Sequence, residues 1–141
     1  MKEMFCFQCQ QTAHNTSCDG RAGVCGKKAD TANRQDELIG MLTAMAKAAE
    51  NGDRTENTDL LMLKGLFTTI TNVNFNNETI MTLTREIEAE KARLGGKEIA
   101  TLDMRDIWEA NEDIRSLKSL ILFGIKGMAA YAYHALALGM T

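Results

Sequence analysis

Hydrophobic residues recur at the three- and four-residue spacing of α-helices along much of the chain. The first stripe predicts a helix that begins at Asp30 or Thr31, either of which can cap an N-terminus. The same helix is expected to stop at Asn51-Gly52, a pair that favours a helix C-terminus. Its predicted buried face consists of Leu38, Leu42, Met45 and Ala49.

Two further helices are predicted on either side of a polar break. The second begins at Thr58-Asp59, and the third opens near Asn77 and ends at Gly95-Gly96. Between them, Asn and Thr side chains compete with a helix for backbone hydrogen bonds. The expected buried residues are Leu63, Leu66, Phe67 and Ile70, then Ile80, Leu83, Ile87 and Leu94. A solvated face of the third helix is expected at Glu86, Glu88, Glu90, Lys91 and Arg93.

The most apolar part of the chain lies near its end. A short helical turn at residues 103–108 is expected to lead into a long helix from about Asn111 to Leu138. Lys126 interrupts this apolar stretch and would cost roughly 2.5–3.5 kcal/mol in a bilayer, so we expect a buried core helix and no membrane contact. A place at the centre of a bundle is indicated by its small residues, which are Gly124, Gly127, Ala129, Ala130 and Ala132.

The composition is that of an ordinary helical domain. Of the 141 residues, 45% are hydrophobic and 25% are charged, and no proline interrupts the helical pattern. We therefore predict an all-α fold, an up-down helical bundle formed by residues 30–141 and preceded by an irregular loop at residues 1–29, within a single domain of residues 1–141. The net charge is −3 and no run of Lys or Arg exceeds two residues, so we expect no nucleic-acid partner.

All four cysteines of the chain fall within its first 25 residues, as Cys6-x2-Cys9-x8-Cys18-x6-Cys25. Four thiolates on a glycine-rich loop are the donor set of a tetrahedral zinc site or of an iron–sulfur cluster. No apolar signal segment precedes the cysteines, which favours the reducing cytoplasm, where disulfides are rare. The loop is therefore expected to bind a metal centre.

The spacing favours an iron–sulfur cluster and leaves zinc open. Structural zinc sites usually pair two short CxxC-like knuckles, whereas six residues separate Cys18 from Cys25. Zinc also commonly anchors domains that are too small for a core of their own, which this chain is not. We therefore expect a [4Fe–4S] cluster, with zinc as the alternative.

Segments along nearly the whole chain resemble the hybrid cluster proteins, the prismane family of hydroxylamine reductases. The loop is similar in MFCFQCQQTA at residues 4–13, NTSC at 15–18 and GVCGK at 23–27. The helical segments are similar in NRQDELI at 33–39, GLFTTITNVNF at 65–75, NEDIRSL at 111–117 and GIKGMAAYAYHA at 124–135. Two departures, a longer gap before Cys25 and a shorter stretch at 95–108, concern loop geometry.

The resemblance implies the helical N-terminal domain of that family. Cys6, Cys9, Cys18 and Cys25 would then bind a cubane cluster, usually [4Fe–4S] and in some members [2Fe–2S]. Its role would be electron transfer toward a second, hybrid cluster, at which the family reduces hydroxylamine and NO-type nitrogen species. The ligands of that cluster lie in later domains, so whether this chain is itself an enzyme stays open.

The partners expected are a redox donor protein and the hybrid-cluster domains on another chain, and an apolar surface left by absent domains would favour a homo-oligomer. The alternative function is a catalytically silent structural or interaction module with a four-cysteine zinc or cluster site. The residues expected to tune a cluster are Phe5, Phe7, Gln8, Gln10 and Gln11.

The remaining candidates are expected to have structural roles. His14 is interpreted as a polar surface residue, and His134 as a hydrogen-bonded packing residue. Trp108 is expected to cap the core. Methionine can ligate soft metals, but the scattered methionines are expected to fill the core. Those placed at core positions of the predicted helices are Met41, Met45, Met62, Met81 and Met128.

Overall fold

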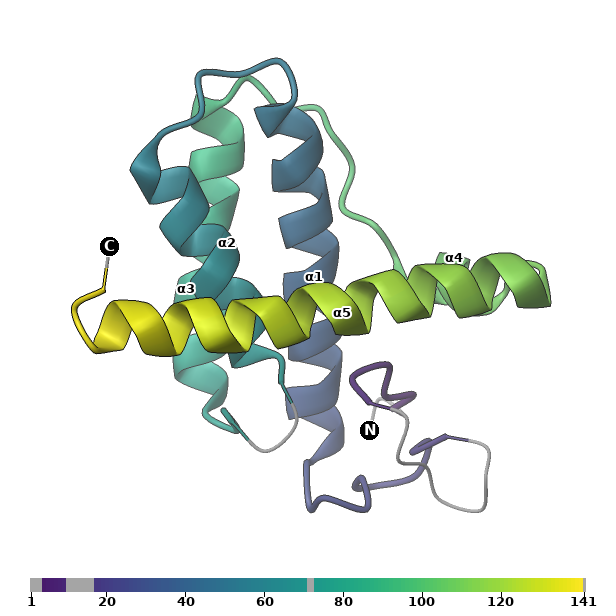
Figure 1. Ribbon diagram of the computed structural model, residues 1–141. Helices are drawn as coiled ribbons and strands as arrows, with labels where there is room; N and C mark the ends of the chain where they lie inside the picture. The colour runs from purple at the N-terminus through teal and green to yellow at the C-terminus, as the bar shows by residue number, and fades with distance from the viewer. Residues whose placement is uncertain (1–3, 10–16, 71–72, 141) are drawn as a thin grey trace.

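The computed structural model describes residues 4–9, 17–70 and 73–140, and within them the regular structure is helical (Figure 1). The helices are α1 (Ala29–Ala49), α2 (Glu56–Thr68), α3 (Asn77–Arg93), α4 (Met104–Trp108) and α5 (Glu112–Ala137). The prediction of an all-α fold is confirmed.

The first three long helices run side by side in an up-and-down arrangement, with α1 packed on both α2 and α3 (Figure 1). The hydrophobic faces predicted for α1 and α3 meet here, and fully burying one Leu or Ile side chain contributes roughly 1.5–3 kcal/mol. The buried residues at this interface include Leu38, Leu42, Met45, Leu61, Leu66, Ile80, Leu83 and Ile87. The face predicted for α2 was wrong in part, because only Leu66 of it is buried, while Leu63, Phe67 and Ile70 are partly buried and Phe67 stacks on Tyr133 of α5.

The helix starts show where sequence patterns were sufficient and where they were not. The third helix begins at Asn77 as expected. Asn76 caps it, because its side-chain oxygen accepts the backbone N–H groups of Glu78 and Thr79 at 3.0 and 3.2 Å. The predicted start of α1 was late: the helix begins at Ala29, and Asp30 lies in its first turn. The start of α2 was also late, because Thr58 is the third helical residue and completes a capping box with Thr55.

Part of the expected solvated face of α3 is buried. Glu90 accepts hydrogen bonds from Thr58 at the start of α2 and from Arg93, whose Nη2 lies 2.7 Å away. These hydrogen bonds lower the pKa of Glu90 to about 2. Lys91 is also buried and donates from Nζ to the carbonyl of Ile99 at 2.8 Å. The prediction was thus wrong for Glu90 and Lys91, because the start of α2 packs on Glu90 and the segment after α3 folds back over Lys91.

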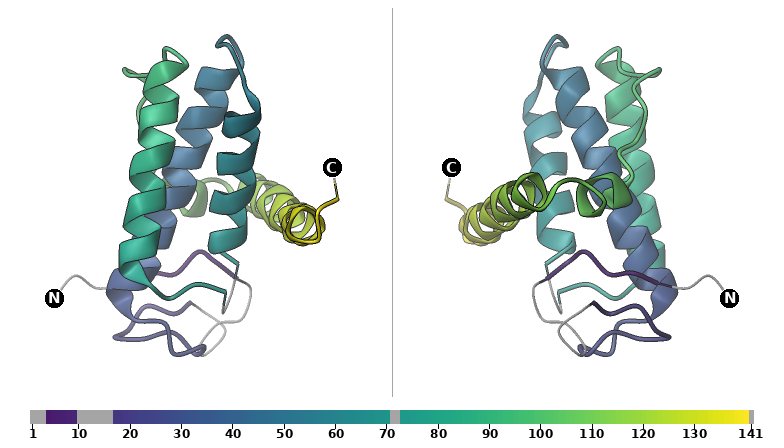
Figure 2. Two further views of the ribbon diagram at one scale, coloured as in Figure 1. Left: turned by 90° about the vertical axis from the view of Figure 1, so that its left-hand side faces the viewer. Right: turned by 90° about the vertical axis from the view of Figure 1, so that its right-hand side faces the viewer.

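The last long helix, α5, crosses the outside of the three-helix bundle and packs on α2 and α4, as the end-on views of Figure 2 show. Only Lys126 and Ala129 are buried within it. A Cβ added at Gly124 or Gly127 would meet no atom within 4 Å. The expected central position of this helix was therefore wrong. Gly124 and Gly127 face space that the described part of the chain does not fill, whereas Ala129 is buried.

The outer face of α5 is apolar and exposed. Its large exposed side chains are Ile114, Leu117, Leu120, Ile121, Ile125, Met128, Tyr131 and Leu136. By length and composition, α5 is also the one helix in the described ranges that passes the test for a membrane span. Its inner face, however, packs on other helices and carries the buried Lys126.

Gly40 on α1 makes the closest backbone contact that a glycine provides in this fold. A Cβ at this position would lie 2.1 Å from the carbonyl oxygen of Leu102, which belongs to the segment before α4. We expect Gly40→Ala to lower the free energy of unfolding by about 1–3 kcal/mol, because a backbone segment must move. Urea denaturation followed by circular dichroism measures this change.

Gly124→Ala provides the matched control, since it also places alanine in a helix but meets open space. We expect it to be neutral or to stabilise the chain by up to about 1 kcal/mol, because alanine favours helices over glycine. Equal stability of the two variants would contradict the close approach of Leu102 to α1.

Candidate metal centre

The four cysteines of the N-terminal loop line one pocket beside the N-terminal end of α1. The same pocket is lined by Gly23, Val24 and Lys27. Cys18 is buried, and the other three cysteines are partly buried. The irregular loop that carries them lies below the helices in Figure 1. The structure therefore gathers the predicted ligand residues around one space.

Backbone hydrogen bonds join the two halves of the cysteine loop. The N–H of Cys6 donates to the carbonyl of Cys18 at 3.0 Å. The hydroxyl of Ser17 donates to the carbonyl of Cys6 at 3.4 Å. These contacts place the first and third cysteines next to each other without a helix or a sheet.

Two glycines shape the second half of the loop. Gly26 has a φ of +85°, which other residues rarely adopt. A Cβ added at Gly23 would lie 3.5 Å from Cys25 Sγ and 3.7 Å from Cys18 Sγ. Glycine at position 23 thus leaves the space beside two sulfur atoms free of side-chain atoms.

The chemistry of this pocket fits an all-thiolate metal centre. Four thiols border it, a glycine leaves room beside two of them, and the ammonium of Lys27 provides a positive charge at its edge. Among the residues that the structure describes, no three Cys, His, Asp or Glu side chains converge as around a single metal ion. The ligand roles of Cys6, Cys9, Cys18 and Cys25 stay a prediction.

A chain of buried polar side chains ties the Cys6–Cys9 segment to two helices. Lys126 of α5 donates from Nζ to Gln8 Oε1 at 2.5 Å. Gln8 in turn donates from Nε2 to Asp36 Oδ1 on α1. Gln8 and Lys126 are 2% and 3% exposed, so neither has water as an alternative partner. The amide of Gln8 therefore fixes the loop between α1 and α5.

Burial shifts the pKa values of Asp36, Lys126 and Cys6 toward their neutral forms. It raises the pKa of Asp36 to about 7, against the hydrogen bond from Gln8 and the charges of Lys27 and Lys126. It lowers the pKa of Lys126 to about 8, against the attraction of Asp36. It also raises the pKa of the Cys6 thiol, and Lys27 opposes this shift.

Aromatic side chains cover the same segment of the loop. The ring centroids of Phe5 and Phe7 lie 4.7 Å apart, and that of Trp108 lies 4.7 Å from Phe5. Arg115 of α5 sits over the Trp108 ring at 4.8 Å. Trp108 was expected to cap the core, and it instead packs at the end of α4 against the loop. The expected tuning residues Gln10 and Gln11 lie outside the described residues.

The other sequence candidates do not join the cysteines. His14 lies outside the described residues. His134 lies in the last turn of α5, with Nδ1 2.7 Å from the carbonyl of Ala130 and its ring edge on Phe67, which confirms its packing role. Met41 and Met45 are buried as predicted, and Met62 and Met81 are partly buried. Met128 is 73% exposed, so its assignment to the core was wrong.

Three residues of the site were missed by sequence reasoning: Lys27, Asp36 and Lys126. Lys126 carried a signal, because a lone lysine in an apolar helix needs either a partner or solvent. Asp36 and Lys27 look like ordinary surface residues in the sequence, and only the folded chain shows that they are enclosed.

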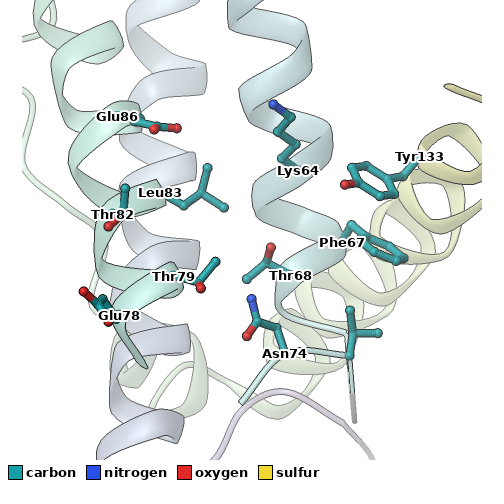
Figure 3. A pocket seen from close by; sticks show the side chains of 11 residues that line it. Lys64, Phe67, Thr68, Asn74, Glu78, Thr79, Thr82, Leu83, Glu86 and Tyr133 are labelled. Atoms are coloured by element: carbon teal, nitrogen blue, oxygen red, sulfur yellow. The ribbon is translucent and has the colours of Figure 1, made fainter. Parts of the chain in front are cut away.

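A second hollow, between α2 and α3, has no cysteine or histidine in its lining. Figure 3 shows Lys64 and Glu86 on these facing helices, with Phe67 and Tyr133 at one side. The Phe67 and Tyr133 rings stack at 4.3 Å and join α2 to α5. The hollow is thus a space between packed helices, with polar side chains such as Lys64 and Glu86 at its edge.

The raised pKa of Asp36 makes stability depend on pH. Between its ordinary value of 3.8 and about 7, the folded chain holds more protons on Asp36 than the unfolded chain does. The free energy of unfolding therefore falls as the pH rises across this window. In the metal-free chain, Asp36→Asn should remove a slope of up to about 1.4 kcal/mol per pH unit.

Urea denaturation at several pH values between 4 and 7 tests this expectation. Glu37→Gln is the matched control, because Glu37 is the exposed neighbour of Asp36 on α1. We expect the control to retain the wild-type slope. Equal slopes for Asp36→Asn and wild type would show that Asp36 titrates as an ordinary carboxyl group.

Comparison with known proteins agrees with the arrangement of the loop and helices. The model of the Prismane/CO dehydrogenase family matches residues 4–141. Hydroxylamine reductase of Desulfitobacterium hafniense strain Y51 is 42% identical over an alignment of 166 residues. This alignment covers 96% of this chain and 30% of that protein. Hydroxylamine reductase of Caldanaerobacter subterraneus is 42% identical over 168 residues, covering 97% and 30%.

A more distant relative shows the same coverage. Hydroxylamine reductase of Bacteroides thetaiotaomicron is 38% identical over 159 residues, which cover 96% of this chain and 29% of that protein. The chain thus spans about 30% of the length of the curated relatives that it matches. With a family match over almost its whole length, the chain belongs to the Prismane/CO dehydrogenase family.

Proposed function

We propose that this chain is the electron-transfer part of a hydroxylamine reductase-type protein, and that it holds a [4Fe–4S] cluster on Cys6, Cys9, Cys18 and Cys25. One observation carries the proposal: the four cysteines line a single pocket in a chain of an iron–sulfur protein family. Four cysteine thiolates are the usual ligand set of such a cluster.

The cluster, when bound, supplies reversible one-electron chemistry. The chain supplies the four thiolates and the frame around them. The Lys126–Gln8–Asp36 chain fixes the segment between Cys6 and Cys9, so the first two sulfurs keep their places. The rings of Phe5, Phe7 and Trp108 pack against one another and make the surroundings of this segment more apolar, and a less polar environment raises the electrostatic influence of nearby charges.

The partners follow from the same proposal. Electrons come from a redox donor protein and pass to a second cluster, which belongs to the remaining part of the family's polypeptide. Reduction of hydroxylamine or NO-type nitrogen species takes place there. A reducing compartment such as the cytoplasm keeps the four cysteines available as ligands.

Metal analysis of anaerobically purified protein tests the cluster. We expect about four iron and four acid-labile sulfide per chain, with a broad visible absorption that dithionite bleaches. About two of each would indicate a [2Fe–2S] cluster. One zinc without colour would overturn the electron-transfer proposal and support the structural module.

Two variants locate the cluster within the chain. Cys18→Ser removes the buried thiol and should abolish most of the iron and colour, because serine does not replace a thiolate ligand well. Val24→Ser is the control, since Val24 borders the same pocket but is 62% exposed. Equal iron content in the two variants would exclude Cys18 as a ligand.

The apolar outer face of α5 supports a further part of the proposal. Relatives have about 70% of their length outside the matched region, and we propose that this remaining part covers Leu117, Leu120 and Ile121. An exposed apolar face of this kind favours association when its partner is absent. The 141-residue chain is therefore expected to self-associate through α5.

Light scattering across a range of protein concentrations measures this association. We expect the wild-type chain to form dimers or larger species, and Leu120→Lys, at a side chain that is 70% exposed, to shift it toward monomer. Lys118→Met, at an exposed position one turn away from Ile121, should not favour the monomer. A wild-type monomer at high concentration would contradict the proposed role of this face.

A further inference from the structure

Lys27 is the most enclosed charged residue of the cysteine loop. Its side chain is 1% exposed and lines the pocket together with all four cysteines. Its Nζ lies 3.9 Å from Cys6 Sγ, within the range of a hydrogen bond to sulfur. The position directly follows the Cys25-Gly26 pair. The ammonium group is therefore directed toward the sulfur atoms.

The surroundings of Lys27 contain no carboxylate at salt-bridge distance within the described ranges. The two ion pairs found there join Arg54 to Asp59 and Arg93 to Glu90. Among the described residues, the ammonium also lies over the ring of Phe75, whose centroid is 5.8 Å from Nζ. A buried ammonium without an anion is costly. Apart from the longer-range attraction of Asp36, whose pKa Lys27 lowers, a counter-charge for this ammonium would come from thiolates in the pocket.

The neighbouring lysines are placed differently. Lys28 is exposed to water although it is adjacent in sequence. Lys126 is buried, but it donates to Gln8 and is attracted by Asp36. Of these three, Lys27 donates to Cys6 Sγ, whereas Lys126 donates to Gln8 and interacts with Cys6 and Cys9 through its charge. The contact with sulfur therefore indicates a role of Lys27 at the pocket that the other two lysines do not share.

We propose that Lys27 is the positioned counter-charge of the four-thiolate centre, where it strengthens metal binding and raises the reduction potential of the bound cluster. The inference rests on the proposed function, because it requires a centre held by thiolates. Four thiolates make the centre negative, and each added electron increases that charge. A fixed cation nearby therefore stabilises the reduced form more than the oxidised form.

The test compares Lys27→Met, which removes the charge at similar length, with Lys28→Met at the exposed neighbour. Reduction potentials are measured by anaerobic redox titration of the visible absorption, and metal affinity by competition with an iron chelator. We expect Lys27→Met to shift the potential to more negative values and to weaken metal retention at least tenfold. Lys28→Met should change both far less, because water and salt screen its charge.

Lys27→Arg keeps the positive charge and should recover most of the wild-type potential. A potential of Lys27→Met that differs from wild type by no more than that of Lys28→Met would overturn the proposal. A wild-type protein that binds zinc or no metal would instead contradict the proposed function, so the two failures are distinguishable.

Stability of the metal-free chain separates a counter-charge from a structural residue. Without a bound cluster, Lys27 faces neutral thiols, and its burial is a cost. Metal-free Lys27→Met should therefore be at least as resistant to urea as the metal-free wild type. A clear loss of helical circular dichroism or of urea resistance in this metal-free variant would overturn the proposal, because Lys27 would then be needed by the fold itself.

Discussion

The structure depends on the burial of charge beside a loop that has almost no regular secondary structure. Gln8 makes this burial possible, because its amide accepts a hydrogen bond from Lys126 and donates one to Asp36 at the same time. Neither ion needs to reach water, and neither is left without a partner. The cysteine segment gains a fixed position from two helices, although it forms no helix itself.

The helical periodicity of the sequence was sufficient for the fold class and for most of the core. It correctly assigned Leu38 and Leu42 of α1 and Ile80 and Ile87 of α3 to the core, since burial on one face of a helix leaves a pattern that needs no tertiary information. The location of α5 could not be obtained in this way. An apolar helix has the same hydrophobic sequence pattern at the centre of a bundle and on a surface that another part of the protein covers.

In the candidate site, too, some residues could be found from the local sequence and others only from the folded structure. The clustering of the cysteines in sequence was enough to indicate a shared centre, because short loops keep their residues together. The roles of Lys27 and Asp36 depend on which neighbours enclose them, and these neighbours come from distant segments, such as Phe75 and Lys126. Charge burial is a tertiary property, so no local pattern records it.

The hydrogen bond between Lys126 and Gln8 joins residues that are 118 positions apart. During synthesis, which proceeds from the N-terminus, the four cysteines leave the ribosome long before α5 does. The loop therefore has its contact with α1 early, but lacks its contact with α5 until nearly all of these 141 residues have been made. A metal centre on the four cysteines would therefore gain its complete frame only after α5 has docked.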